Sequence, residues 1–203
     1  MRSLVAVVIS MLGLVAGGCA PTPAPTIAVR PAATATALPP LSVTLMTGAS
    51  WSPASARGKI LLIDVWASWC APCRAGLRRA DALAAADPDL AVIGLSLDED
   101  DAAVRAFLAD VPVRFASARV DAAVLAAAPL GITTLPALIL VDADGRVRWI
   151  GQDIDDTAYD AVAAAIVQLH AEAVQPQPLV QPGFSGRPRA RSIVHSQALR
   201  EPS

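Results

Sequence analysis

The chain has 203 residues, a formal net charge of −2 and a hydrophobic content of 54%. This length suggests one globular domain with extensions, and the small net charge gives no electrostatic case for binding nucleic acid. Alanine and valine supply most of the apolar residues, so composition alone does not indicate a membrane protein.

The N-terminus is typical of an export signal. Arg2 precedes an apolar run over residues 4–16, which is shorter than the roughly 20 residues that span a bilayer. The run ends in Ala-Gly-Gly followed by Cys19, a pattern that resembles a bacterial lipobox. We therefore predict a signal peptide over residues 1–18 and a lipid anchor on Cys19. Two alternatives stay open at this point: an ordinary signal peptide with a chance cysteine, and an uncleaved membrane anchor.

Two further segments have compositions that do not build a hydrophobic core. Residues 19–40 are rich in proline, alanine and threonine, and we expect an extended tether there. Residues 171–203 are rich in glutamine, proline, arginine and serine, and we expect a disordered tail. The folded domain is predicted to span residues 41–170.

Within this domain, apolar patterns alternate between strands and helices. Strands are expected over residues 60–66, 90–97, 113–115, 136–141 and 146–151. Helices are expected over residues 72–86, from the acidic run 98–101 onward, over 121–128 and over 156–170. The turn at 142–145 is a strong hairpin signal. The acidic run is interpreted as a helix start whose charge matches the helix dipole. Together these elements predict an α/β sandwich around a mixed sheet.

Cys70 and Cys73 lie between the expected strand 60–66 and the expected helix 72–86. A cysteine at a helix N-terminus faces unpaired backbone N–H groups and the positive end of the dipole, which lowers the pKa of its thiol. The thiolate is the species that attacks disulfides. The order strand, CxxC, helix therefore predicts a dithiol–disulfide exchange site.

Metal binding is the main alternative for this pair. Zinc sites need three or four protein ligands, but the chain offers only three cysteines and two histidines, His170 and His195, both far along the chain. We therefore predict no metal and no other cofactor. Two thiolates can also hold Cu(I), so a non-catalytic Cu(I)-binding or thiol-holding protein stays open as the second interpretation.

Three runs of sequence, 63–73, 131–136 and 141–145, resemble the thioredoxin superfamily. The form WASWCAPC and the inserted segment 98–128 are similar to its TlpA/ResA-like branch of extracytoplasmic, membrane-tethered thiol-disulfide oxidoreductases. The resemblance implies a thioredoxin-like fold, in which a mixed central β-sheet is flanked by helices and carries the TlpA-type insertion. It also implies partner protein disulfides outside the cytoplasm, an upstream membrane electron donor and a monomer. We expect the chain to reduce its partners.

The resemblance assigns roles at the pair and at a distant proline. Cys70 matches the attacking thiol and Cys73 the resolving thiol, which form a disulfide with each other. Pro136 matches a cis-proline that lies against this disulfide, and the backbone of Leu135 matches the segment that pairs with the substrate chain. On the residues alone, Pro136 could equally be a proline at the start of a strand.

Four other positions near the pair are singled out by the resemblance. Trp69 matches a tryptophan that shields the site, although core packing is an alternative role, and Pro72 is expected beside it at the substrate surface. Asp64 stands where thioredoxins carry a buried aspartate; burial raises the pKa of a carboxyl, so it could take the proton of Cys73. The alternative is a hydrogen-bonded strand-end residue. Gly76 stands where several TlpA-like reductases have glutamate.

Overall fold

The structure is a computed structural model that describes residues 26–127 and 129–174. Its six main strands are β1 Thr36–Ala37, β4 Ile60–Trp66, β5 Leu90–Ser96, β6 Ala116–Arg119, β7 Ala137–Val141 and β8 Arg146–Gln152. Two short strands, β2 Val43–Thr44 and β3 Ser50–Trp51, pair with each other. The helices are α1 Cys73–Ala86, α2 Asp101–Asp110, α3 Ala122–Ala126 and α4 Asp156–Val174, with a 3-10 turn at Pro53–Ala56.

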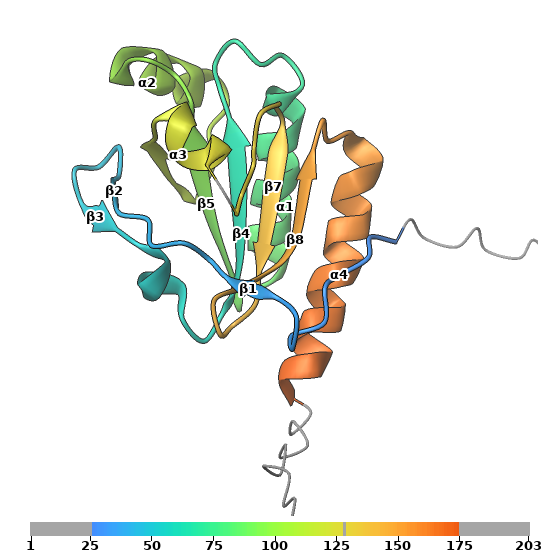
Figure 1. The fold of residues 1–203 in the computed structure, drawn as a ribbon. Helices are drawn as coiled ribbons and strands as arrows, with labels where there is room; N and C mark the ends of the chain where they lie inside the picture. The colour runs from blue at the N-terminus through green and yellow to red at the C-terminus, as the bar shows by residue number, and fades with distance from the viewer. Residues whose placement is uncertain (1–25, 128, 175–203) are drawn as a thin grey trace, which may run out of the picture.

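The main strands form one mixed sheet in the order β1-β8-β7-β4-β5-β6 (Figure 1). β4, β5 and β6 run parallel, whereas β7 runs antiparallel to β4, β8 to β7 and β1 to β8. This mixed sheet flanked by helices is the predicted fold. The segment 98–128 that we expected as an insertion supplies α2, β6 and α3.

The central strand β4 is buried along its whole length, between β5 and β7. Successive side chains of a strand point to opposite faces of the sheet. Leu61 and Ile63 therefore pack on one face, in a core that includes residues of α3, while Leu62 packs on the other. Asp64 follows Leu62 by two residues, so its carboxyl lies on the face that carries α1 and α4.

α1 and α4 cover that second face of the sheet (Figure 1). The apolar side of α4 includes Tyr159, Val162, Ile166 and Leu169, which pack with Leu138 and other residues of β7 and β4. α4 continues to Val174, four residues past the expected end. Within the described ranges, no helix is both long and apolar enough to cross a bilayer.

The strand expected at 113–115 is displaced. The strand that forms is β6, whose backbone pairs with β5 from Ala116 to Arg119. Val113 and Phe115 are instead partly buried beside the core that contains the cysteine pair. The reason is that Ala116–Arg119 has few residues with high β-propensity, and pairing with β5 outweighs that local preference.

The expected tether does not extend to residue 40. β1 pairs with β8, and Ile27 and Val29 pack against the core that includes α4. Ala35 is buried. The segment 26–40 thus belongs to the folded domain. Backbone pairing and a few apolar contacts hold it there, although its composition alone predicts no contact with the domain. Residues 1–25 and 175–203, with the predicted signal peptide, Cys19 and most of the expected tail, lie outside the described residues.

Candidate active site

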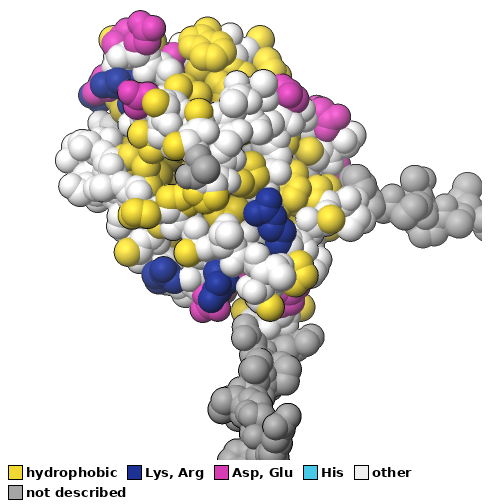
Figure 2. All heavy atoms as spheres, in the orientation of Figure 1, with side chains coloured by type: hydrophobic (Ala, Val, Ile, Leu, Met, Phe, Trp, Pro, Cys, Tyr) yellow, Lys and Arg dark blue, Asp and Glu magenta, His cyan; other side chains and the backbone are white. Residues whose placement is uncertain are grey.

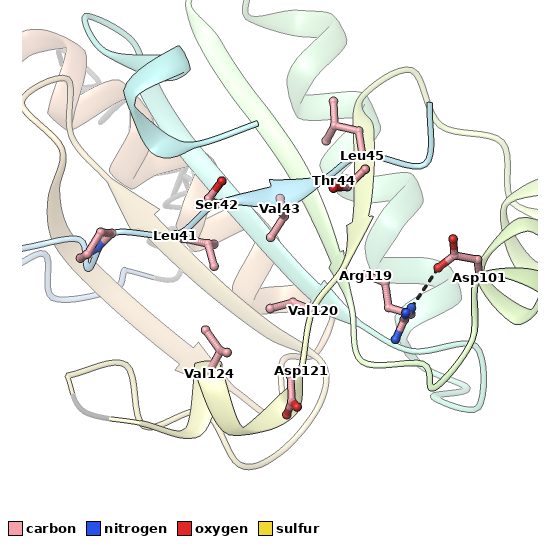
Figure 3. Close-up of a pocket in the computed structure, with 11 residues that line it drawn as sticks. Leu41, Ser42, Val43, Thr44, Leu45, Asp101, Arg119, Val120, Asp121 and Val124 are labelled. Carbon is pink, nitrogen blue, oxygen red and sulfur yellow. Dashed lines mark hydrogen bonds and ion pairs between the residues drawn. The ribbon is translucent and has the colours of Figure 1, made fainter. Parts of the chain in front are cut away.

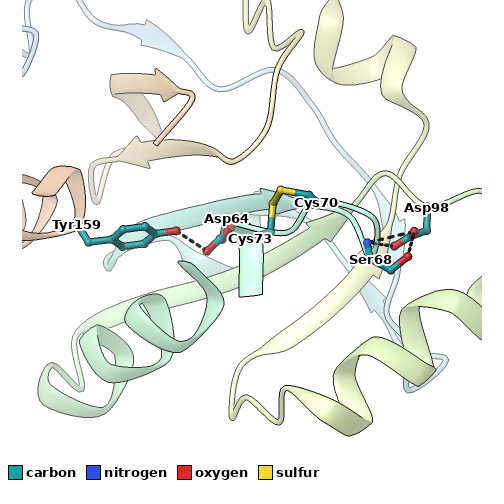
Figure 4. The surroundings of a disulfide bond; sticks show 6 residues. All are labelled: Asp64, Ser68, Cys70, Cys73, Asp98 and Tyr159. Atoms are coloured by element: carbon teal, nitrogen blue, oxygen red, sulfur yellow. Dashed lines mark hydrogen bonds between the residues drawn. A yellow bond between two sulfur atoms is a disulfide. The ribbon is translucent and has the colours of Figure 1, made fainter. Parts of the chain in front are cut away.

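Cys70 and Cys73 form a disulfide at the carboxyl end of β4 and the start of α1 (Figure 4). Their Cα atoms lie 5.4 Å apart. Cys70 is 5% exposed and Cys73 is completely buried. Within the described residues, no side chain caps the first turn of α1, whose N–H groups donate to backbone carbonyls of residues 70–72. The positive end of the helix dipole is directed toward the pair. These features favour a thiolate at Cys70 in the reduced state.

Trp69 and Pro72 flank the disulfide at the surface. Trp69 is 70% exposed, so the alternative of core packing is wrong. Pro72 is exposed and stands at the N-cap of α1, where a proline loses no helical hydrogen bond. An exposed aromatic ring beside a reactive pair can contact a partner chain.

The segment before β7 lies against the same core. The peptide bond between Leu135 and Pro136 is cis, as expected, and Pro136 is buried. Leu135 is partly buried and packs against the cluster that contains both cysteines. The structure therefore brings the predicted proline segment to the cysteine pair, although more than sixty residues separate them in the sequence.

Asp64 is fully buried beneath the pair, and in Figure 4 its carboxyl lies between Tyr159 and Cys73. Burial raises its pKa to about 7, and a hydrogen bond from the Tyr159 hydroxyl acts in the opposite direction. That hydroxyl donates to Oδ2 at 3.2 Å, while Oδ1 has no hydrogen-bond partner among the described residues. The expected burial and the expected rise in the pKa of Asp64 are thus found. The hydrogen bond from Tyr159 also matches the alternative of a hydrogen-bonded strand-end residue, so a role in proton transfer stays a prediction.

A second buried carboxylate, Asp98, holds the loop before Cys70 (Figure 4). It accepts hydrogen bonds from the backbone N–H and the hydroxyl of Ser68, at 3.0 and 2.6 Å, and from the hydroxyl of Ser96 at 2.7 Å. The interpretation of 98–101 as a helix start is wrong for Asp98, because α2 begins at Asp101 and is capped by Asp100. The sequence did contain a signal for this role of Asp98, because the carboxylate directly follows the buried strand expected at residues 90–97.

Sequence reasoning also missed Gln152, at the end of β8. Its side-chain oxygen accepts from the backbone N–H groups of Thr133 and Thr134, at 2.7 and 3.0 Å, and its side-chain nitrogen donates to the carbonyl of Gly131 at 3.2 Å. One amide thus holds three backbone groups of the loop that leads to Leu135. No local pattern marks such a residue.

The surface also has a depression that is separate from the disulfide (Figure 3). It has a volume of about 570 Å³ and lies between the N-terminal segment around Leu41 and helix α3 around Val124. Figure 2 shows apolar side chains gathered over this part of the molecule. None of the predicted site residues lines it, so it is not part of the candidate active site.

Comparison with known proteins places this geometry in context. The family model described as Redoxin matches residues 29–166. The soluble secreted antigen MPT53 of Mycobacterium tuberculosis is 25% identical over 128 residues, which cover 63% of this chain and 73% of that protein. The thiol:disulfide interchange protein DsbE of Escherichia coli is 28% identical over 93 residues, 46% of this chain and 49% of DsbE. The thiol-disulfide oxidoreductase ResA of Bacillus thuringiensis is 29% identical over 93 residues, 45% of this chain and 53% of ResA.

Solved structures show the same fold. A secreted disulfide oxidoreductase of Mycobacterium tuberculosis, described as homologous to DsbE, superposes with a TM-score of 0.55 at 23% identity, over 64% of this chain and 96% of that one. A thioredoxin-family thiol:disulfide interchange protein of Chlorobium tepidum gives a TM-score of 0.56 at 21% identity, over 65% and 95%. The thioredoxin-like fold predicted from the sequence is confirmed.

Proposed function

This chain belongs to the Redoxin family, and from that premise we propose that it is a thiol-disulfide oxidoreductase that works through Cys70 and Cys73. One observation carries the proposal: a close cysteine pair at an uncapped helix start, with the more exposed member first and a buried carboxyl of raised pKa below. The names of DsbE and ResA support it.

The proposed reaction has two exchange steps. The Cys70 thiolate attacks a partner disulfide; a bond forms between Cys70 and one partner sulfur, and the other partner sulfur leaves as a thiolate. Cys73 then attacks the Cys70 sulfur, which breaks the mixed disulfide and releases the second partner thiolate. The partner gains two electrons, and the chain is left with the Cys70–Cys73 disulfide that the structure contains. A dithiol donor must reduce this disulfide before the next cycle.

The second step needs a proton acceptor, because Cys73 is completely buried and begins as a thiol. Asp64 is suited to this task, since the pKa of about 7 that burial gives it lies close to neutral. In the proposed cycle the proton of Cys73 passes to Asp64 as the sulfur attacks. The exposed ring of Trp69, with Pro72 and the backbone of Leu135, forms the surface that contacts the partner.

We further propose that the chain acts as a reductant outside the cytoplasm. The Asp64 carboxyl and the Ala-Pro pair between the cysteines favour a reductant, and a secreted relative supports the location. The N-terminal pattern supports export, and Cys19 would carry the lipid that holds the chain at a membrane near its electron donor. No other cofactor is needed for the exchange.

A trapping experiment tests the exchange reaction. The full chain with Cys73→Ser, once reduced, should accumulate a covalent adduct with oxidised insulin that dithiothreitol releases, because the first step proceeds and the second does not. Cys70→Ser is the matched control and should form no such adduct. Adduct formation through Cys73, or Cu(I) binding by a chain that reduces no disulfide, would overturn the proposal. The redox potential of the pair then decides between reductant and oxidant.

The anchor is tested separately. Cys19→Ser should move the chain from the membrane fraction to the soluble extracytoplasmic fraction, since no lipid can then be attached. Chain that stays on membranes after a carbonate wash would contradict the lipid anchor and favour an uncleaved N-terminal helix.

A further inference from the structure

Position 76 in α1 has no side chain, and the hydroxyl of Tyr159 fills that space. A Cβ atom at Gly76 would lie 2.5 Å from Tyr159 Oη and 3.3 Å from Tyr159 Cζ. The first distance is shorter than two such atoms can approach, so a side chain at 76 and the Tyr159 hydroxyl exclude each other. Glycine is less favourable than alanine inside a helix, and the close approach of Tyr159 gives a packing reason for it here.

The hydroxyl that Gly76 admits reaches the buried carboxyl of β4. Tyr159 donates to Asp64 Oδ2 at 3.2 Å, and Asp64 Oδ1 is buried without a hydrogen-bond partner in the described part of the chain. Burial and the nearby Asp64 charge raise the pKa of Tyr159 far above its ordinary value. The phenol therefore stays protonated and acts only as a donor to Asp64 throughout the working pH range.

We propose that Tyr159 is a positioning residue for the proton transfer from Cys73: it fixes one oxygen of Asp64 and leaves Oδ1 free to accept the proton. This inference rests on the proposed function. In the step concerned, the Cys73 S–H bond breaks and its proton goes to Asp64 Oδ1. The electron pair that stays on Cys73 Sγ forms the bond to Cys70, and the partner sulfur leaves as a thiolate.

Few other charges act on this carboxyl. From β5 and β7, the residues paired with Asp64 are Gly94 and Leu138, which carry no charge. From α1, Cys73 lies beside the carboxyl in Figure 4, and it becomes a titratable group once the disulfide is reduced. From α4, Tyr159 is the direct partner.

The remaining charges lie where α1 and α4 meet at the surface. Asp156 also acts on the Tyr159 hydroxyl. Arg79 of α1 lies 3.7 Å from Asp156 and 3.4 Å from Asp160 and is exposed. Since these groups are solvated and paired with one another, the Tyr159 hydrogen bond is the main interaction that offsets the effect of burial on Asp64.

The test is the pH dependence of mixed-disulfide resolution in the full chain. Tyr159→Phe keeps the ring and removes only the hydroxyl, so Asp64 loses the hydrogen bond that stabilises its charged form. The rate should still rise with pH, but its midpoint, expected near 7 in the unmodified chain, should move up by roughly one pH unit. Titration of the Asp64 carboxyl carbon by NMR in the oxidised chain should show the same upward shift without any turnover.

A second variant tests the packing argument. Gly76→Ala places a Cβ against the Tyr159 hydroxyl and should raise the midpoint in the same direction. In the Tyr159→Phe background, Gly76→Ala should add little, because no hydroxyl remains to be displaced. Val162→Ala is the matched control: Val162 is buried on the same side of α4, so the variant should lower the melting temperature and leave the midpoint unchanged.

The outcomes separate this inference from the proposed function. If Tyr159→Phe lowers stability but leaves both midpoints unchanged, while Asp64→Asn removes the pH dependence, the positioning role is wrong and the exchange mechanism stands. If Tyr159→Phe and Gly76→Ala shift the pH midpoint additively, the positioning role of Tyr159 is also wrong. If the unmodified chain forms no mixed disulfide through Cys70, the proposed function itself fails.

Discussion

At the scale of single residues, Asp64 is an ionisable group whose burial in the core is energetically unfavourable. An isolated carboxylate in an apolar interior is unfavourable unless it is fully hydrogen-bonded, and Asp64 has one partner for two oxygens. Its pKa of about 7 in the folded chain compares with an ordinary value of 3.8. The folded state therefore binds this proton more tightly than the unfolded state does.

This difference makes a prediction about stability. Because the folded chain holds the Asp64 proton between about pH 4 and 7, the contribution of Asp64 to the free energy of unfolding should fall as pH rises through this window and level off above it. Asp64→Asn should remove this dependence and stabilise the chain at pH 8 by up to roughly 4 kcal/mol, with no gain at pH 4. Urea unfolding of the two chains at both pH values measures it. An equal difference at pH 4 and pH 8 would contradict the buried-charge explanation.

Sequence reasoning reached Asp64 but not its partner. The position of Asp64 relative to Cys70 is local and carries a family signal, so its burial and raised pKa could be predicted. Tyr159 lies 95 residues further on, in a helix where an apolar pattern predicts only that its ring is buried. At position 76 the resemblance indicated only that glycine replaces the glutamate of several TlpA-like reductases. The space that Gly76 leaves for the Tyr159 hydroxyl depends on how α1 and α4 pack, and no local pattern predicts that packing.

At the scale of elements, the loop before β7 depends on a side chain from β8. Gln152 holds the backbone of Gly131, Thr133 and Thr134 by three hydrogen bonds. The loop residues themselves are exposed, apart from Ile132. Ile132 is held by its own backbone bond to Leu125. Without the amide of Gln152, the backbone N–H groups of Thr133 and Thr134 would lose their partner. The predicted bounds of β7 and β8 agree with the structure to within one residue. The contact from Gln152, the last residue of β8, to the loop before β7 is visible only in the fold.

We therefore predict a substrate-dependent effect of Gln152→Met. Loss of the three bonds should lower kcat/KM for a protein disulfide by about tenfold through KM, while the rate with a small aromatic disulfide changes little. In the proposed mechanism, a small disulfide reacts at Cys70 without contacting the loop, whereas a protein substrate also contacts the backbone at Leu135. Thr134→Val removes the hydroxyl contacts with Gln152 at 3.4 Å and Asp153 at 3.1 Å but keeps the backbone N–H that Gln152 binds, so it should leave both rates nearly unchanged. Equal losses with both substrates would show that Gln152 does not act through this loop.

At the scale of the whole molecule, Arg148 joins three distant segments. Its buried guanidinium lies 3.3 Å from Asp142 in the β7–β8 turn and 2.6 Å from Glu172 near the end of α4, and it donates to the carbonyl of Arg30. The backbone N–H of Arg30 donates back to the carbonyl of Arg148 at 2.8 Å. The first and last described segments of the chain are thus held to one arginine. Composition predicted a tether at Arg30, because no sequence pattern indicates that a buried arginine far along the chain binds the backbone there.

Arg148→Met should consequently destabilise the fold and loosen both ends. Removing one partner from a buried ion pair typically costs about 3–5 kcal/mol, because the remaining carboxylate is left buried; Asp142 is only 12% exposed. Hydrogen exchange at Arg30 and in the last turn of α4 should rise more than in β4. Arg114→Met, which removes an exposed guanidinium from its pair with Asp81, should change stability much less. Exchange that rises equally in every element would argue against a local clamp.

The pairing of residues 26–40 with the domain sets how far the domain could travel from a surface. With the proposed lipid on Cys19, eight residue steps (27 minus 19) lead to Ile27, which packs against the core. Fully extended, these steps reach roughly 28 Å, whereas a free segment to Pro40 would reach more than twice as far. The domain would then stay within a thin layer beside the membrane, which raises its effective concentration near neighbouring membrane proteins. Its partners would be proteins whose disulfides lie within that layer. The length of the segment after Cys19 would then limit the choice of partner as much as the contacts at Trp69 do.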